Sequence, residues 1–193
     1  MNFEDYINDL KSDTPVPGGG SASALVAVES AALNIMVSRF SMKKRFKNIE
    51  NNIKKIIDDS ESYIKDLYSL REQDEKTFLN IMNDIKMKTR NNDNIIKNLR
   101  VSWKIIYISI KNMENSIFLA EHGNKNLISD AISAFYFSFG SAKTSFYNIL
   151  ENIKLLDDNF DAYIKTMAIR DIINDLKTQM CNIELKYHYK PHF

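Results

Sequence analysis

No proline occurs between Pro17 and Pro191, and this long interval restricts the possible folds more than any other feature of the sequence. Proline breaks helices because it lacks a backbone N–H and its ring clashes with the preceding turn. In the same interval apolar residues recur at three- and four-residue steps, which is typical of helices that bury one face. The sequence therefore predicts an all-α protein.

The apolar spacing and the turn residues together predict six helices that pack as one antiparallel bundle. They cover residues 2–11, 21–42, 47–88, 92–121, 127–155 and 158–188, with room for one break in the third. A chain of 193 residues, 44% of them hydrophobic, can bury one substantial core. Because no internal repeat or boundary divides it, we expect residues 1–193 to form a single domain.

The helix expected over residues 21–42 has an apolar face that we expect to be buried. Its members are Ala22, Leu25, Ala32, Leu33, Met36 and Phe40. Glu29 interrupts this face.

Composition excludes several classes of protein. The 26 basic and 25 acidic residues nearly cancel, whereas dedicated nucleic-acid binders usually carry a basic excess. No run approaches the ~18 uncharged apolar residues of a membrane span, and the acidic N-terminus does not resemble a signal peptide. The single cysteine, Cys181, cannot form an internal disulfide and fits a reducing compartment. We expect a cytoplasmic protein that binds neither nucleic acid nor membrane.

Three of the five glycines are consecutive, at Gly18, Gly19 and Gly20, and they follow a Pro-x-Pro segment directly. Glycine tolerates positive φ and lets another group approach the backbone closely. The helix that begins beside Ser21 offers free N–H groups and the positive end of its dipole. The segment is therefore suited to hold an anion or a polar ring; an ordinary glycine-rich linker is the alternative.

Three carboxylates, Glu29, Asp74 and Asp130, fall on expected apolar faces. A carboxylate in a core must be paired, hydrogen-bonded or protonated, because removing its charge from water is costly. Each also has a structural explanation: a lysine partner for Glu29, a boundary position for Asp74, and stabilisation by the helix dipole for Asp130.

The helix expected over residues 127–155 has one face of small and polar residues. Its members, at three- and four-residue steps, are Asp130, Ala134, Ser138, Ser141, Ser145, Asn148 and Asn152. A solvated face would carry lysine and glutamate, so this one indicates either a helix–helix seam or the wall of a polar pocket.

These motifs together resemble the formiminotetrahydrofolate cyclodeaminase and methenyltetrahydrofolate cyclohydrolase family, which includes the cyclodeaminase half of formiminotransferase-cyclodeaminase. The most specific block is Thr14–Ala22, TPVPGGGSA. The other blocks are Met36-Val37 followed by Lys43-Lys44 and Phe46, Asp74 with Phe78, Gly123-Asn124-x-Asn126-x-x-Ser129-Asp130-Ala131, and Asn148-Ile149-x-x-Asn152. The resemblance spans residues 3–185.

The resemblance implies an all-helical homodimer that acts on one-carbon derivatives of tetrahydrofolate. The cyclodeaminase closes 5-formiminotetrahydrofolate to 5,10-methenyltetrahydrofolate and releases ammonia, and the cyclohydrolase interconverts the methenyl and 10-formyl forms. Both reactions need a positioned acid/base group. The three histidines, His122, His188 and His192, show no ligand spacing, so we expect no metal and no cofactor beyond the folate substrate.

The resemblance also implies roles for individual residues. Asp130 is expected to be the catalytic acid/base, and Asp74 the second carboxylate, which orients the pterin or shares the proton transfer. Amides can both donate and accept hydrogen bonds, and four are expected to bind the pterin edge: Asn124, Asn126, Asn148 and Asn152.

Two further groups are expected to bind the substrate. Backbone N–H groups would come from Gly18, Gly19, Gly20 and Ser21. Lys43 and Lys44, with Arg45, would hold the glutamate carboxylates of the folate, although basic residues at a helix C-terminus are also ordinary capping.

The sequence departs from the family pattern at Glu29 and Ser30, over residues 82–88, and at Gly140, Lys143 and Tyr147. Two alternatives to an active folate enzyme therefore stay open at this point. One is a folate-binding or scaffold homologue that has lost turnover. The other is an unrelated helical oligomerisation module in which the polar face is a dimer seam. The motif residues do not distinguish cyclodeaminase from cyclohydrolase.

Overall fold

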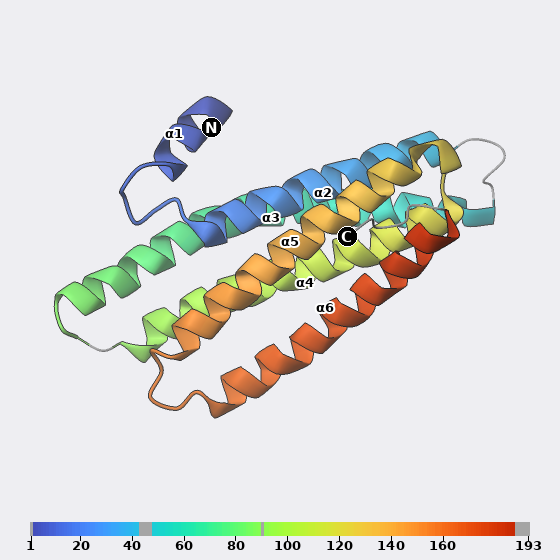
Figure 1. Ribbon diagram of the computed structural model, residues 1–193. Helices are drawn as coiled ribbons and strands as arrows, with labels where there is room; N and C mark the ends of the chain where they lie inside the picture. Colours follow the sequence, from blue (N-terminus) through green and yellow to red (C-terminus); the bar gives the residue numbers. More distant parts are fainter. Residues whose placement is uncertain (1, 43–47, 90, 188–193) are drawn as a thin grey trace.

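The computed structural model describes residues 2–42, 48–89 and 91–187, and within these ranges every regular element is a helix (Figure 1). The elements are α1 (Phe3–Leu10), α2 (Gly19–Ser41), α3 (Glu50–Lys86), α4 (Asn92–His122), η2 (Lys125–Leu127), α5 (Ile128–Ile153) and α6 (Phe160–Lys186). The all-α prediction is confirmed, and α3 runs without a break.

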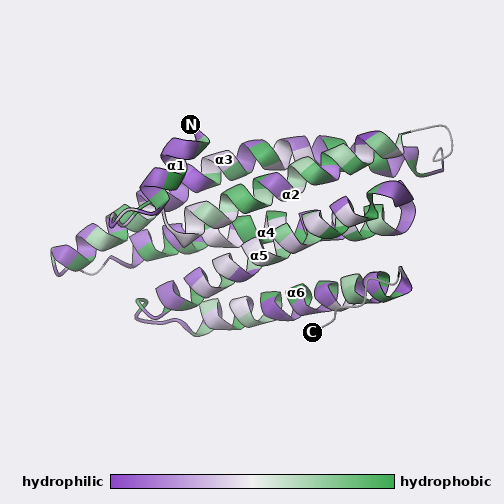
Figure 2. Ribbon diagram, turned by 45° about the horizontal axis from the view of Figure 1, so that its top comes forward, coloured by the Kyte–Doolittle hydropathy of each residue, from purple (hydrophilic) through white to green (hydrophobic). Residues whose placement is uncertain are grey.

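The long helices α2 to α5 form an antiparallel bundle, with α6 along one side and α1 outside it (Figure 1). Helix α2 packs mainly on α3 and α5, α4 packs on α5 and α3, and α6 packs on α5 and α4. Every long helix carries both hydrophobic and hydrophilic residues along its length (Figure 2). Side chains such as Leu99, Met113, Phe135 and Ile149 are fully buried between these helices.

The buried face of α2 differs from the expected one. Ala24, Ala27 and Ala31 are fully buried, whereas Ala32 is exposed and Leu33 is only partly buried. The buried face of α2 is the one that carries the small residues, which let α2 approach its neighbours closely. Glu29 is exposed, so the expectation of a core carboxylate at that position was wrong.

The polar face of α5 is mostly a seam. Ser138 donates to Ser30 Oγ at 2.6 Å, Ser30 donates to the Ala134 carbonyl at 2.6 Å, and the hydroxyls of Ser23 and Ser145 are 2.9 Å apart. These hydroxyls satisfy one another in the interior, so α2 and α5 pack closely without burying unpaired polar groups at these positions. Only the last turns of this face leave the seam and border a cavity.

The Gly123-Asn124 turn joins the α4–α5 connection to the C-terminal end of α2. The Asn124 backbone N–H donates to Ser41 Oγ at 2.9 Å, and the Asn124 side chain accepts from the Asn126 N–H at 3.2 Å and so caps η2. A methyl group on Gly123 would lie 2.6 Å from the Leu119 carbonyl oxygen, so only glycine fits. This motif therefore has a structural role in the turn.

In the part of the chain that the structure describes, α2 is the one helix long and apolar enough to cross a membrane by length and composition. This differs from the expectation drawn from the sequence. In the bundle, 61% of its most apolar window is buried, as in the core helix of a globular domain.

Candidate functional site

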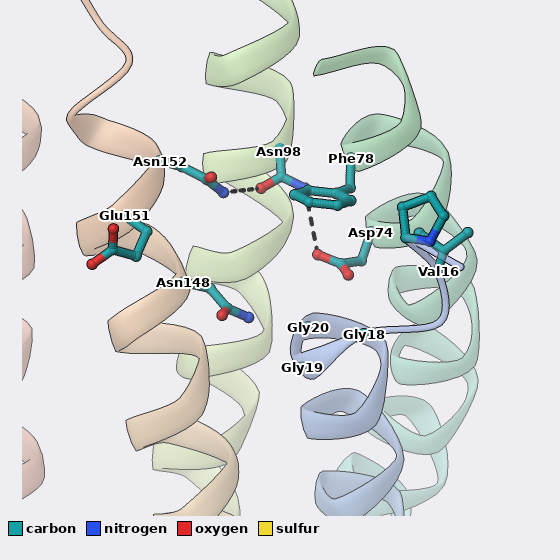
Figure 3. A pocket seen from close by; sticks show the side chains of 11 residues that line it. Val16, Gly18, Gly19, Gly20, Asp74, Phe78, Asn98, Asn148, Glu151 and Asn152 are labelled. Atoms are coloured by element: carbon teal, nitrogen blue, oxygen red, sulfur yellow. Dashed lines mark hydrogen bonds between the residues drawn. The ribbon is translucent and has the colours of Figure 1, made fainter. Parts of the chain in front are cut away.

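A cavity of about 190 Å³ lies where the N-terminus of α2 meets α3, α4 and α5 (Figure 3). Four separate segments of the chain contribute to its wall. The lining residues are Pro15, Val16, Gly18, Gly19, Gly20, Asp74, Phe78, Asn98, Asn148, Glu151 and Asn152. The structure thus brings together the glycine segment, one of the three singled-out carboxylates, and the two amides near the end of α5.

The carboxylate of Asp74, on α3, lies against the first turn of α2. A methyl group built on Gly20 would lie 2.2 Å from Asp74 Oδ2, so the contact requires glycine. The Ser21 backbone N–H donates to this carboxylate, and the positive end of the α2 dipole faces it. No glycine among the described residues has a positive φ, so at Gly20 the absence of a side chain serves close approach.

Ser21 also holds the glycine loop in place. Its hydroxyl accepts from the Gly18 N–H and donates to the Gly18 carbonyl, both at 3.1 Å. This reciprocal pair fixes the start of α2, because Gly18 has no side chain with which to cap it.

A chain of amides links Asp74 to α5 through Asn98, which is only 1% exposed. Asn152 Nδ2 donates to Asn98 Oδ1 at 2.6 Å, and Asn98 Nδ2 donates to Asp74 Oδ1 at 3.4 Å (Figure 3). Asn98 Nδ2 also donates to Thr77 Oγ1 at 2.9 Å. Asn98 therefore orients Asp74 and Asn152 together. The prediction from sequence missed Asn98, although its three-residue spacing from the apolar residues Ile95 and Val101 was the available signal.

Burial raises the pKa of Asp74 from its ordinary 3.8 to about 6. The hydrogen bond from Asn98 and the N–H of Ser21 lower this pKa, and the charge of Glu75 raises it, but desolvation is the largest effect. A carboxyl group with such a pKa exchanges protons readily near neutral pH. It is therefore suited to general acid/base catalysis.

The remaining walls of the cavity differ in character. Phe78, partly buried, provides an apolar ring, and Asn148 lies opposite Gly19, where an added methyl would be 3.7 Å from its side-chain oxygen. Glu151, which the prediction also missed, is exposed at the rim and pairs with Lys154 at 2.7 Å. The cavity can thus offer hydrogen bonds to the edge of a heterocycle and an apolar face to its ring.

Other residues predicted from the sequence do not line this cavity. Asp130 is half-buried near the opposite end of α5, about 27 Å from Asn148 at the rise of an α-helix. Asn124 and Asn126 belong to the turn at that same end. Lys43 and Lys44 lie outside the described residues. Among the described residues, no group of three His, Cys, Asp or Glu side chains could hold a metal ion.

Comparison with known proteins identifies the family and the fold. The family model for formiminotransferase-cyclodeaminase matches residues 2–168. The chain belongs to this family. Its fold is similar to the crystal structure of formiminotetrahydrofolate cyclodeaminase from Thermotoga maritima, with a TM-score of 0.81 and 22% sequence identity over 95% of this chain and 91% of that chain.

A curated relative is similar over a shorter segment. This is the methenyltetrahydrofolate cyclohydrolase of Methylorubrum extorquens, 32% identical over 73 residues. The match spans 37% of this chain and about a third of the relative, 35% of its length. Membership of the formiminotransferase-cyclodeaminase family excludes the alternative of an unrelated oligomerisation module.

The contact between Gly20 and Asp74 predicts that alanine substitutions at two neighbouring glycines have different effects on the free energy of unfolding. Gly20→Ala should lower the free energy of unfolding by about 1–3 kcal/mol, because the new methyl and the buried carboxylate cannot occupy their present positions together. Gly19→Ala is the matched control: its methyl would meet only ordinary contacts at 3.7 Å, and we expect a change within about 0.5 kcal/mol. Urea unfolding measures both, and equal losses would contradict the close contact.

The raised pKa of Asp74 predicts how its replacement depends on pH. With respect to this group, the folded state is most stable below pH 4, and that stability is lost as the pH rises through about 6. Asp74→Asn cannot ionise, so it should match the wild type at pH 4 and exceed its free energy of unfolding by up to about 3 kcal/mol at pH 8. Asp58→Asn, at an exposed position on α3, is the control. A gain that does not depend on pH would show that Asp74 is not desolvated.

Proposed function

We propose that this protein is a cytoplasmic enzyme that forms or opens the 5,10-methenyl bridge of tetrahydrofolate. It would act as a 5-formiminotetrahydrofolate cyclodeaminase or a methenyltetrahydrofolate cyclohydrolase, without a cofactor beyond the folate substrate. The observation that carries the proposal is the Asp74 carboxyl, with a pKa of about 6, in a cavity lined by amides and by the N-terminus of α2. Family membership supplies the reaction class.

The amides suit the pterin. Its edge alternates hydrogen-bond donors and acceptors, and Asn148 and Asn152 offer both kinds of group. Phe78 provides a surface for the ring, and the N–H of Gly19 lies at the start of α2. Asn98 bonds to both Asp74 and Asn152, so it would hold the Asp74 carboxyl at a fixed position relative to the pterin.

In the cyclodeaminase reaction, N10 of the folate attacks the formimino carbon and the bond from that carbon to the departing nitrogen breaks. The formimino group would react in its protonated amidinium form, so that the attack by N10 leaves the exocyclic nitrogen as an NH2 group. Protonated Asp74 would donate its proton to this nitrogen, which leaves as ammonia, and would then take up the proton lost from N10; the positive charge of the substrate remains on the methenyl product. Its pKa of about 6 makes the acid form available near neutral pH.

In the cyclohydrolase reaction, Asp74 would begin as the base. The carboxylate would take a proton from water as the oxygen adds to the methenyl carbon. The carbon–N5 bond would then break, Asp74 would return a proton to N5, and the hydroxyl proton of the intermediate would go to solvent, which leaves 10-formyltetrahydrofolate. One carboxyl group that alternates between its protonated and ionised forms could therefore catalyse either reaction.

The absorbance of methenyltetrahydrofolate tests the proposal directly. It should appear when purified protein is mixed with formiminotetrahydrofolate if the protein is a cyclodeaminase. It should disappear faster than the uncatalysed rate from methenyltetrahydrofolate if the protein is a cyclohydrolase. No change in either reaction, from protein shown to be folded, would contradict the proposal and favour an inactive folate-binding homologue.

Two variants assign the acid/base role. Asp74→Asn should lower kcat by a factor of about 10² or more, because the proton donor and acceptor is lost. Asp130→Asn, about 27 Å along α5 from Asn148 in the cavity wall, should retain turnover. In the wild type, kcat of the deaminase reaction should fall as the pH rises through about 6, and kcat of the hydrolase reaction should rise. Full activity of Asp74→Asn would return the role to Asp130.

We also propose that the protein is a homodimer that associates through the outer face of α2. This face carries Leu33, Met36 and Phe40, the last of them 50% exposed, and Glu29 as its one acidic residue. A second copy would remove these apolar side chains from water. Ala32→Arg should then give a monomer in light scattering, whereas Ala168→Arg, at an exposed alanine on α6, should not. A monomeric wild type would contradict this proposal.

A further inference from the structure

A second cavity of about 180 Å³ lies beside the candidate site, toward the α3–α4 turn. Its walls are mostly apolar, from Ile81 and Ile85 on α3, Ile95 on α4 and Leu155 after α5. Lys154 stands at its rim. The acidic side chain in the wall, Asp84, accepts a hydrogen bond from Asn94 Nδ2 at 2.7 Å.

The residues that line the second cavity continue the helix faces that line the first. On α3, Asp74 and Phe78 line the first cavity, and Ile81 and Ile85 line the second; the steps of four, three and four residues place them on one face. From Asp74 to Ile85 this face extends about 16 Å along the helix.

The other two walls continue in the same way. On α4, Ile95 lies about one turn from Asn98, toward the α3–α4 turn. Leu155 lies about one turn beyond Asn152, just after α5. An ion pair joins the two rims: Lys154 Nζ, at the second cavity, is 2.7 Å from Oε1 of Glu151, at the first.

The chemistry of the two cavities matches the successive parts of a folate. The polar first cavity suits the pterin, the apolar second cavity suits an aminobenzoyl ring, and the Lys154 amine, whose side chain is 65% exposed, suits a carboxylate at the surface. We propose that the second cavity binds the aminobenzoylglutamate portion of the substrate, with Lys154 contacting a glutamate carboxylate. This inference rests on the proposed function, because it takes a folate as the ligand.

Helix α3 continues to Lys86, so Ile85 lies within its last turn and contributes to the wall of the second cavity, which Lys154 also borders.

Titration calorimetry with two folates that differ only in the glutamate tests the inference. The probes are 5-formyltetrahydrofolate and 5-formyltetrahydropteroate, which lacks the glutamate. Lys154→Gln should weaken binding of the first about threefold to fivefold, as expected for an exposed ion pair, and leave binding of the second unchanged. Ile85→Ser should weaken both about fivefold to tenfold through lost apolar contact.

Matched controls exist for both variants. Lys111→Gln breaks a similar pair, Lys111 with Glu114 at 2.7 Å, far from both cavities, and Leu79→Ser removes a partly exposed apolar side chain of α3 that lines neither cavity. Neither control should change the affinity for either probe.

The outcomes separate the inference from the proposed function. Unchanged affinity in Lys154→Gln, or an equal loss for both probes, would overturn the role of Lys154, and unchanged affinity in Ile85→Ser would overturn the aryl site. Tight binding with the expected variant effects but no turnover would overturn the proposed function alone. A wild type that binds neither probe would overturn both.

Discussion

The contact between the Asp74 carboxylate and the first turn of α2 determines the rest of the candidate site. It requires a glycine at position 20, since a methyl there would lie 2.2 Å from Asp74 Oδ2. It places a carboxyl group where burial raises its pKa to about 6, while the Ser21 N–H and Asn98 keep it hydrogen-bonded. The same contact positions the start of α2 against α3 and so shapes one wall of the cavity. The glycine segment, the carboxylate and the helix N-terminus therefore form one unit.

The bundle around this unit is held partly by small polar side chains. Ser30 and Ser138 bond to each other between α2 and α5, and Asn112 Nδ2 donates to the Ala27 carbonyl at 3.1 Å. Such contacts need closely spaced helices, which the buried alanines of α2 permit. Close packing leaves little internal space, and the first cavity opens where the seam ends, at Asn148 and Asn152.

The sequence predicted the fold well because apolar periodicity is a local signal and each long helix has its own. It predicted the site only in part. Asp74, Asn148 and the glycines do line one cavity, but Asp130, on the same face of α5 as Asn148, lies about 27 Å away. Periodicity shows which residues share a face and not at what height along the bundle each meets its neighbours. Asn98 was missed for a related reason. Its role depends on Asp74 and Asn152, which are both far from it in the sequence.

The ionisation of Asp74 tests the central claim most directly. The ¹³C chemical shift of its side-chain carboxyl, followed by NMR from pH 3 to pH 9 and assigned by its loss in Asp74→Asn, reports the protonation of this group alone. A midpoint near pH 6 is the result that the burial of Asp74 beside α2 predicts. A midpoint near 4, the ordinary value of an exposed aspartate, would contradict both the desolvated carboxyl and its assignment as the acid/base group.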